Sequence, residues 1–154
     1  MNSDYLYFYN KLIKLTTNKN LYDGYIEIDT FNDRLVFFFL HFAFFLKAFK
    51  KKENTKVLQE IYDFNFRQLE LSIREIGYGD QSVNKKMKIY INLFHSIVSK
   101  INLWEIYEKP NKNEVFSFFL KDLNNIDYLV GYFDDFYKEL IKKTLNSYLK
   151  SVRS

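Results

Sequence analysis

The two histidines of this 154-residue chain are the side chains best suited to ligate a metal ion or move a proton near neutral pH. They are His41 and His95, and the chain has no cysteine. Neither histidine lies in the Glu-x-x-His pair of a di-iron bundle, and two histidines without cysteine are too few for zinc. The geometry of a helical bundle would allow His41 and His95 to ligate a haem from two sides. The alternative is that both histidines are core or boundary residues.

Nucleophilic catalysis and phosphate binding find little support in the residues. Ser96 follows His95, but adjacent residues on a helix point about 100° apart, so the two cannot pair directly. The run Gly77-Tyr78-Gly79 matches neither a Walker loop nor a dinucleotide fingerprint. We therefore predict a protein that is not an enzyme and that holds no metal or cofactor.

Three lysines form a short basic cluster at Lys85, Lys86 and Lys88, with Tyr90 nearby. Such a cluster indicates either a solvated face or a site for nucleic acid or an anionic membrane surface. The chain has a net charge of +4, and its basic residues are overwhelmingly lysine. Since arginine is the usual phosphate reader, specific DNA binding is not predicted.

The segment of residues 74–80, Arg-Glu-Ile-Gly-Tyr-Gly-Asp, has the pattern of a helix stop, a tight turn and a helix start. Gly77 lies where a helix C-terminal glycine belongs, and Tyr78 would then pack back on Ile73. Asp80 can accept N–H groups that open the next helix. The residues alone therefore predict a corner between two antiparallel helices.

The stretch from Leu35 to Phe49 must be buried, because as a helix it would be apolar on nearly every side. A membrane span needs about 20 apolar residues, whereas this run is shorter and is interrupted by His41 and Lys47. We therefore expect a central helix of a protein core. Its second face, with Phe37 and Phe44, is either the far side of that core or the floor of a binding groove.

Helical spacing of apolar residues continues through the rest of the chain, and four Gly and one Pro leave little room for tight turns. Pro110 is expected to separate two helices. We expect a loop at residues 16–29, with a short extended piece at residues 25–28. We predict an all-α, single-domain, irregular bundle of about five to six helices over residues 1–154, around the Phe-rich helix. The expected helices span residues 4–15, 30–51, 54–76, 80–107, 114–123 and 125–152, and Thr30 or Asn32 is the expected N-cap of the second.

Several short runs follow one another in an order typical of a known family. They are Asp29-Thr30-Phe31 with Arg34 and Leu40-His41, then residues 61–67 (IYDFNFR), 73–80 (IREIGYGD) and 83–88 (VNKKMK). Over roughly residues 21–132 the chain thereby resembles the ubiquinol–cytochrome c chaperone family, the assembly factors of respiratory cytochrome b. It departs from that pattern where Asn84 replaces a proline, where Gln68 and Glu70 replace aspartates, and where residues 93–96 lack a Gly-Arg pair.

The resemblance implies a mostly helical, non-enzymatic assembly chaperone whose client is newly made cytochrome b. Mitochondrial members act with a small helper protein and near the ribosome. The targeting extension of those members is missing, so we expect a bacterial-type protein, cytoplasmic and peripheral to the inner membrane. The alternative is a helical module that binds an anionic membrane surface or nucleic acid through the lysines. The expected client- or partner-binding residues are Arg74, Glu75, Tyr78, Asp80, Lys85, Lys86, Lys88, Phe37 and Phe44.

Overall fold

The computed structural model describes residues 2–23, 31–121 and 123–153, which form helices and connecting turns without a β-strand. The all-α prediction is confirmed. The α-helices are α1 (Asn2–Thr16), α2 (Phe31–Phe49), α3 (Thr55–Glu75), α4 (Asp80–Ile101), α5 (Lys109–Phe119), α6 (Ile126–Ile141) and α7 (Leu145–Ser151). Short 3-10 helices cover Lys19–Tyr22, Lys52–Asn54 and Trp104–Ile106.

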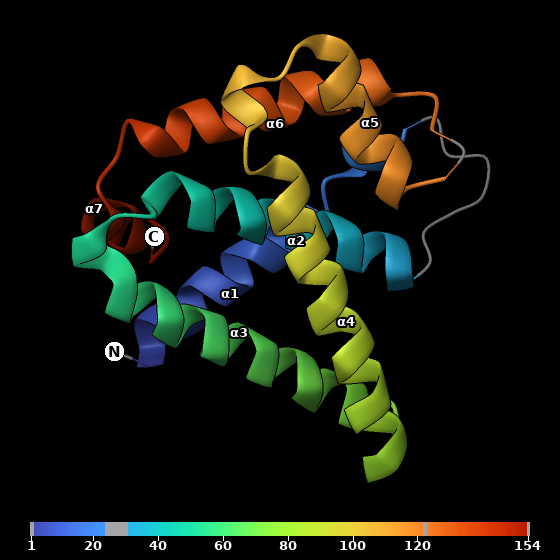
Figure 1. The fold of residues 1–154 in the computed structure, drawn as a ribbon. Helices are drawn as coiled ribbons and strands as arrows, with labels where there is room; N and C mark the ends of the chain where they lie inside the picture. The colour runs from blue at the N-terminus through green and yellow to red at the C-terminus, as the bar shows by residue number, and fades with distance from the viewer. Residues whose placement is uncertain (1, 24–30, 122, 154) are drawn as a thin grey trace.

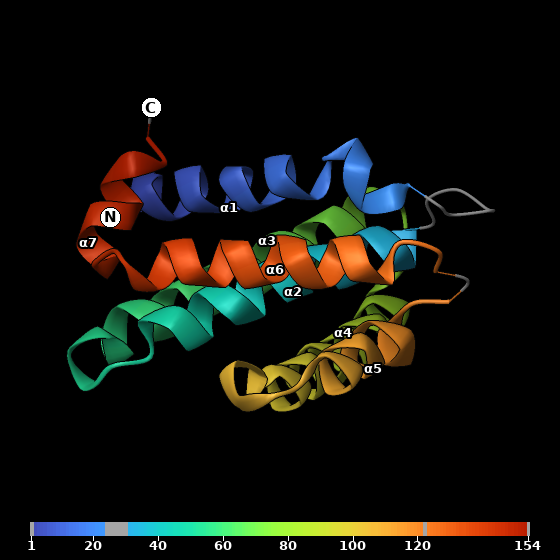
Figure 2. The same cartoon turned by 90° about the horizontal axis from the view of Figure 1, so that it is seen from above.

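Helix α2 is the centre of the bundle, as its sequence predicted. It packs against α1, α4 and α6 (Figure 1). Seen from above, α1 lies on one side of α2 and α6, and α4 and α5 lie on the other (Figure 2). Every residue from Leu35 to Phe45 is buried, because neighbouring helices cover α2 from several directions. A helix without a polar face is stable in water only when it is enclosed in this way.

Aromatic rings from the surrounding helices pack on the phenylalanines of α2. The ring centroids of Phe8 and Phe45 are 4.2 Å apart, those of Phe39 and Phe94 5.2 Å, and those of Phe44 and Phe133 5.3 Å. Such pairs contribute about 0.5–1.5 kcal/mol each beyond the area they bury. The core is thus an aromatic cluster to which α1, α4 and α6 each contribute.

Phe37 and Phe44 belong to this core and not to a binding surface. Both side chains are 0% exposed. Phe37 lies edge-on to Tyr22 at 5.1 Å, and Phe44 packs against Trp104 at 5.0 Å. The suggestion that they form the floor of a groove is therefore wrong: their face of α2 is the far side of the core.

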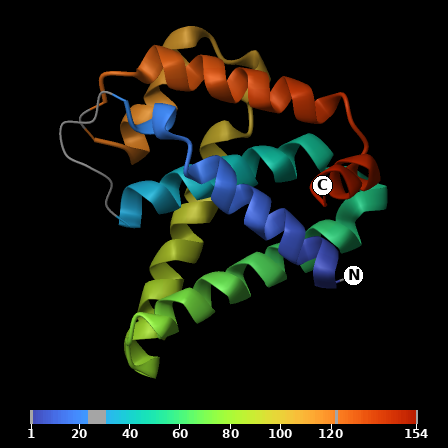
Figure 3. The same ribbon diagram turned by 180° about the vertical axis from the view of Figure 1, so that it is seen from behind.

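Helices α3 and α4 form a corner that projects from the rest of the molecule, as Figures 1 and 3 show from opposite sides. From the corner the two helices diverge. The N-terminal half of α3 runs toward α1, whereas α4 crosses α2. Two hollows lie between α2, α3 and α4, one beside the N-terminal half of α4 and one beside its C-terminal half, and both belong to the region described below.

The C-terminal half of the chain departs from the prediction in two places. The single helix expected over residues 125–152 is broken into α6 and α7, and the hydroxyl of Thr144 accepts the Ser147 N–H at 3.1 Å to begin α7. Pro110 does not separate two helices but lies in the first turn of α5, where a missing N–H costs nothing.

The connections differ from the prediction as well. Helix α4 ends at Ile101, six residues earlier than expected, and the chain continues as the 3-10 helix Trp104–Ile106. The expected loop after α1 contains the 3-10 helix Lys19–Tyr22. The proposed extended piece at residues 25–28 and the proposed cap Thr30 lie outside the described residues. In the described ranges, none of the helices combines the length and the hydropathy that crossing a membrane would require.

Candidate functional site

The α3–α4 corner is the region where most of the sequence-predicted site residues lie. Helix α3 ends at Glu75, and the N–H of Gly77 donates to the carbonyl of Arg74 at 3.0 Å. Gly77 has a φ of 104°, a left-handed conformation that glycine adopts without strain. The glycine therefore turns the chain as predicted, and Gly79 takes the N-cap position of α4.

Arg74 and Asp80 close this corner by pairing with each other. The guanidinium Nη1 of Arg74 donates to Oδ1 of Asp80, and its Nε lies 3.8 Å from Oε2 of Glu70. The hydrogen bond to Asp80 is the main cause that raises the pKa of Arg74 above its usual value. Asp80 was expected to cap α4, but its carboxylate instead accepts the hydrogen bond from Arg74. Both residues thus hold the turn in place.

Tyr78 and Lys86 also come together. The Lys86 Nζ lies 4.6 Å from the centroid of the Tyr78 ring, within the range of a cation–π contact. Both side chains line a hollow of about 280 Å³ beside α2, which they share with Ile73 and Tyr90. Tyr78 therefore faces the same hollow as Ile73, although 43% of its surface stays exposed.

The rest of the corner combines exposed apolar side chains with unpaired cations. Ile76 is 64% exposed and Ile89 is 58% exposed. Lys85 precedes Ile89 by one helical turn. Within the described part of the chain, no ion pair involves Glu75, Lys85 or Lys88. We call this region the corner surface; it comprises Ile76, Tyr78, Lys85, Lys86, Lys88 and Ile89.

A second hollow, beside the C-terminal half of α4, was not predicted. It has a volume of about 640 Å³ and lies between the C-terminal halves of α2 and α4 and the N-terminal half of α3. Its apolar lining includes Leu46, Leu58 and Val98, and Lys50 and Lys51 lie at one end. Sequence spacing could not indicate this hollow, because the residues that line it are distant from one another along the chain.

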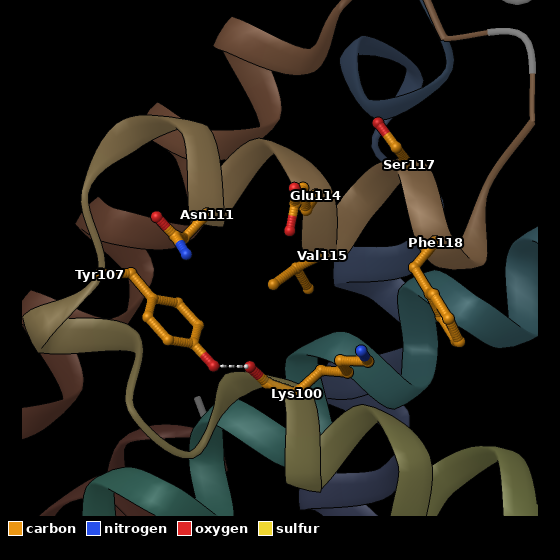
Figure 4. A pocket seen from close by; sticks show the side chains of 7 residues that line it. All are labelled: Lys100, Tyr107, Asn111, Glu114, Val115, Ser117 and Phe118. Atoms are coloured by element: carbon orange, nitrogen blue, oxygen red, sulfur yellow. Dashed lines mark hydrogen bonds between the residues drawn. The ribbon is translucent and has the colours of Figure 1, made fainter.

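A third hollow, of about 370 Å³, lies between the end of α4 and α5 (Figure 4). Two of its polar side chains, Tyr107 and Lys100, make contacts within the protein. The hydroxyl of Tyr107 donates to the Lys100 carbonyl at 2.9 Å, and the Lys100 Nζ lies 4.4 Å from the ring centroid of Phe118. No histidine borders it.

The two histidines do not form a common site. His41 is fully buried, and both ring nitrogens are engaged: Nδ1 donates to the Phe37 carbonyl at 2.7 Å, and Nε2 accepts from the Tyr132 hydroxyl at 2.7 Å. His95 instead bonds to Tyr62 at the surface. His41 therefore has no nitrogen left for a haem iron, and the haem alternative does not fit. No group of three potential metal ligands occurs in the described ranges.

Comparisons with known proteins find similarity in the three helices that line the first two hollows. Residues 28–102, which contain α2, α3 and α4, match the family described as ubiquinol-cytochrome C chaperone. A search of the curated proteins finds no match. The crystal structure of the Cbp3 homolog from Brucella abortus shares the fold, with a TM-score of 0.80 and 22% sequence identity over 96% of this chain and 86% of that chain. The resemblance to the ubiquinol-cytochrome C chaperone family that was predicted from the sequence is confirmed over these residues.

Proposed function

We propose that this protein is an assembly chaperone that binds newly made cytochrome b during the biogenesis of ubiquinol–cytochrome c reductase. The match of residues 28–102 to a chaperone family supports a client-binding role over catalysis. The observation that carries the proposal is the corner surface, where Ile76 and Ile89 are exposed on a projecting hairpin. Exposed apolar side chains grouped beside charged ones are typical of protein-binding sites.

The corner surface suits a client of this kind. A membrane protein that has not yet assembled offers apolar helices, and Ile76, Tyr78 and Ile89 give them an apolar contact. Gly77 and the Arg74–Asp80 pair hold the hairpin in a fixed shape, so little conformational entropy is lost on binding. In this proposal Arg74 and Asp80 position the surface, whereas Tyr78 and the isoleucines touch the client.

The lysines suggest where such a chaperone would work. Lys85, Lys86 and Lys88 flank the apolar side chains, and basic residues beside an apolar tip favour an anionic membrane surface. We propose that the protein acts at the cytoplasmic face of the bacterial inner membrane, as a peripheral component. The second candidate function, a module that binds anionic membranes without a client, is supported by the same lysines.

Recovery of cytochrome b with variants of the corner surface tests the proposal. In cells that make the tagged chain, Ile76→Ser with Ile89→Ser should lower co-purified cytochrome b roughly tenfold, because the apolar contact is lost. Lys85→Glu with Lys86→Glu should lower it as well. The matched control, Lys138→Glu with Lys150→Glu, makes the same change of charge on α6 and α7 and should leave recovery unchanged.

Two outcomes would contradict the proposal. Deletion of the gene should reduce cytochrome b and reductase activity, so normal levels of both would exclude the chaperone role. If the unchanged chain bound phosphatidylglycerol vesicles but recovered no cytochrome b, and the lysine variant lost the vesicle binding, the second candidate function would be favoured instead. Circular dichroism of each variant shows whether its helices remain intact.

A further inference from the structure

The hollow between α2, α3 and α4 has an apolar floor and a charged end. Leu46 of α2, Leu58 of α3 and Val98 of α4 supply apolar surface from three directions. Its volume of about 640 Å³ falls within the range of small-molecule sites, about 300–1,000 Å³. A hollow lined by three helices is thus large enough for an extended hydrocarbon chain.

Positive charge gathers at the end where α2 passes into α3. Lys47 lies there, but its Nζ is 2.8 Å from Oε2 of Glu105 and also donates to the Asn102 carbonyl. Lys47 therefore neutralises a carboxylate and the carbonyl end of α4. Lys50 and Lys51 are exposed and form no ion pair in the described part of the chain, so they leave a net positive charge at this end.

The N-terminus of α3 adds to that charge. Thr55, its first residue, lines the hollow, and the preceding Asn54 does not cap the helix with its side chain. Asn54 instead donates Nδ2 to the Phe49 carbonyl at 2.8 Å. The positive end of the α3 dipole favours an anion near Lys50 and Lys51, whereas the Thr55 N–H itself donates to the Lys52 carbonyl.

The opposite end of the hollow carries no comparable charge. There the Tyr62 hydroxyl and Nε2 of His95 lie 3.0 Å apart and bond to each other. These two atoms thereby satisfy each other, and the Tyr62 ring lies against Phe66 at 4.7 Å between centroids. The two ends of the hollow thus differ. The end where α2 meets α3 is cationic, the floor is apolar, and the paired Tyr62 and His95 side chains border the other end.

We propose that this hollow binds a single-chain anionic amphiphile such as a fatty acid. The carboxylate lies against Lys50, Lys51 and the N-terminus of α3, and the hydrocarbon chain lies on Leu46, Leu58 and Val98. Charge complementarity at one end and apolar surface along the rest match the two parts of such a molecule. The proposal is independent of the proposed function, since it concerns the purified chain alone.

Titration of the purified protein with monomeric dodecanoate, followed by calorimetry, tests this site. We expect saturable binding that Lys50→Glu with Lys51→Glu weakens roughly tenfold or more, because two attractions become repulsions. The control Lys138→Glu with Lys150→Glu should change the affinity less than about twofold. Val98→Trp should block the site by filling it. If that variant does not fold, Leu58→Gln should weaken binding instead, because it places a polar group on the apolar floor.

Two further arms identify the source and the class of ligand. Dodecyl maltoside has the same hydrocarbon chain without a charge, and equal affinity for it would overturn the anionic site. Vesicles of phosphatidylglycerol test a membrane lipid as the source: binding to vesicles that depends on Lys50 and Lys51, without binding of dodecanoate, would overturn the proposal in favour of a membrane contact. Absence of any dodecanoate binding overturns the proposal outright. Dodecanoate binding that Lys50→Glu with Lys51→Glu leaves unchanged overturns it as well.

Discussion

His41 on α2 and Tyr132 on α6 share a buried hydrogen bond of 2.7 Å that links the central helix to the C-terminal half of the bundle. The Nδ1–H of His41 is given to the Phe37 carbonyl, so Nε2 is the acceptor and the Tyr132 hydroxyl the donor. Burial lowers the pKa of His41 to about 4 and raises the pKa of Tyr132 to about 12. Both side chains are therefore neutral at physiological pH.

Removal of the Tyr132 hydroxyl should destabilise the fold. Tyr132→Phe keeps the ring contacts but leaves the buried Nε2 of His41 without a donor, and such a loss costs about 1–3 kcal/mol. The free energy of unfolding in urea, followed by far-ultraviolet circular dichroism, measures the effect. Tyr128→Phe is the matched control on the same helix. Tyr128 is 41% exposed, so its change should stay within about 0.5 kcal/mol.

Stability should fall as the solution becomes acidic, because His41 is buried in its neutral form. The unfolded chain takes up a proton near pH 6.5, whereas the folded chain resists protonation until pH about 4. The stability that His41 contributes is therefore complete above pH about 6.5 and is lost as the pH falls toward about 4. Between pH 7.5 and pH 5 we expect a loss of about 2 kcal/mol in the free energy of unfolding.

The variant His41→Gln separates this effect from the titration of other groups. Glutamine can hydrogen-bond to Tyr132 but takes up no proton in this range, so the loss between the same two pH values should largely disappear. The slope of the free energy of unfolding against pH tests the assignment, whatever the absolute stability of the variant. An equal slope in both proteins would show that His41 does not titrate on unfolding.

The centre of the fold could be predicted from the sequence because α2 is apolar on every side. A helix over Leu35 to Phe45 shields all of these side chains from water only if other helices surround it, and the structure surrounds it in this way. The break between α6 and α7 could not be found in the same way. Leu145 and Tyr148 continue the helical spacing of α6, and periodicity does not register the three intervening residues. The signal for this break in the sequence was Thr144, a residue type that caps helices. In the structure, Ile141 at the end of α6 is 52% exposed.

A substitution at Gly77 should show that the corner depends on a left-handed residue. No atom lies within 4 Å of an added Cβ, so Gly77→Ala introduces no clash and its cost is that of the backbone at a φ of 104°. We expect a loss of about 1–2 kcal/mol in the free energy of unfolding. Gly131→Ala provides the opposite control, because Gly131 lies within α6 with open space around it. That change should stabilise the protein by about 0.5–1 kcal/mol.

The corner and the hollow beside it differ in how far the sequence could reveal them. Residues 74–80 are adjacent, so the turn follows from local rules, although the pairing of Arg74 with Asp80 does not. The hollow joins Lys50 to Val98, which come from helices whose crossing depends on the packing of the whole core. Sequence spacing carries no information on such a crossing, and the apolar residues that line the hollow are indistinguishable from core residues by their pattern.

Asp134 joins Trp104 and Lys112 to α6, and its removal should loosen this end of the bundle. Its Oδ1 accepts the Trp104 indole N–H at 2.7 Å and lies 2.9 Å from the Lys112 Nζ. Trp104 is 1% exposed, so Asp134→Ala leaves a buried N–H without a partner, at a cost of about 1–3 kcal/mol.

Asp135→Ala changes the neighbouring exposed residue and is the matched control. It should alter the free energy of unfolding by less than about 0.5 kcal/mol. Because the chain has one tryptophan, its fluorescence reports on Trp104 alone. In Asp134→Ala we expect both a lower urea midpoint and an altered emission of the folded state, since the indole loses its acceptor while it stays buried. A lower midpoint with unchanged emission would place the effect on Lys112 instead, and equal midpoints in the two variants would show that the indole hydrogen bond does not stabilise the fold.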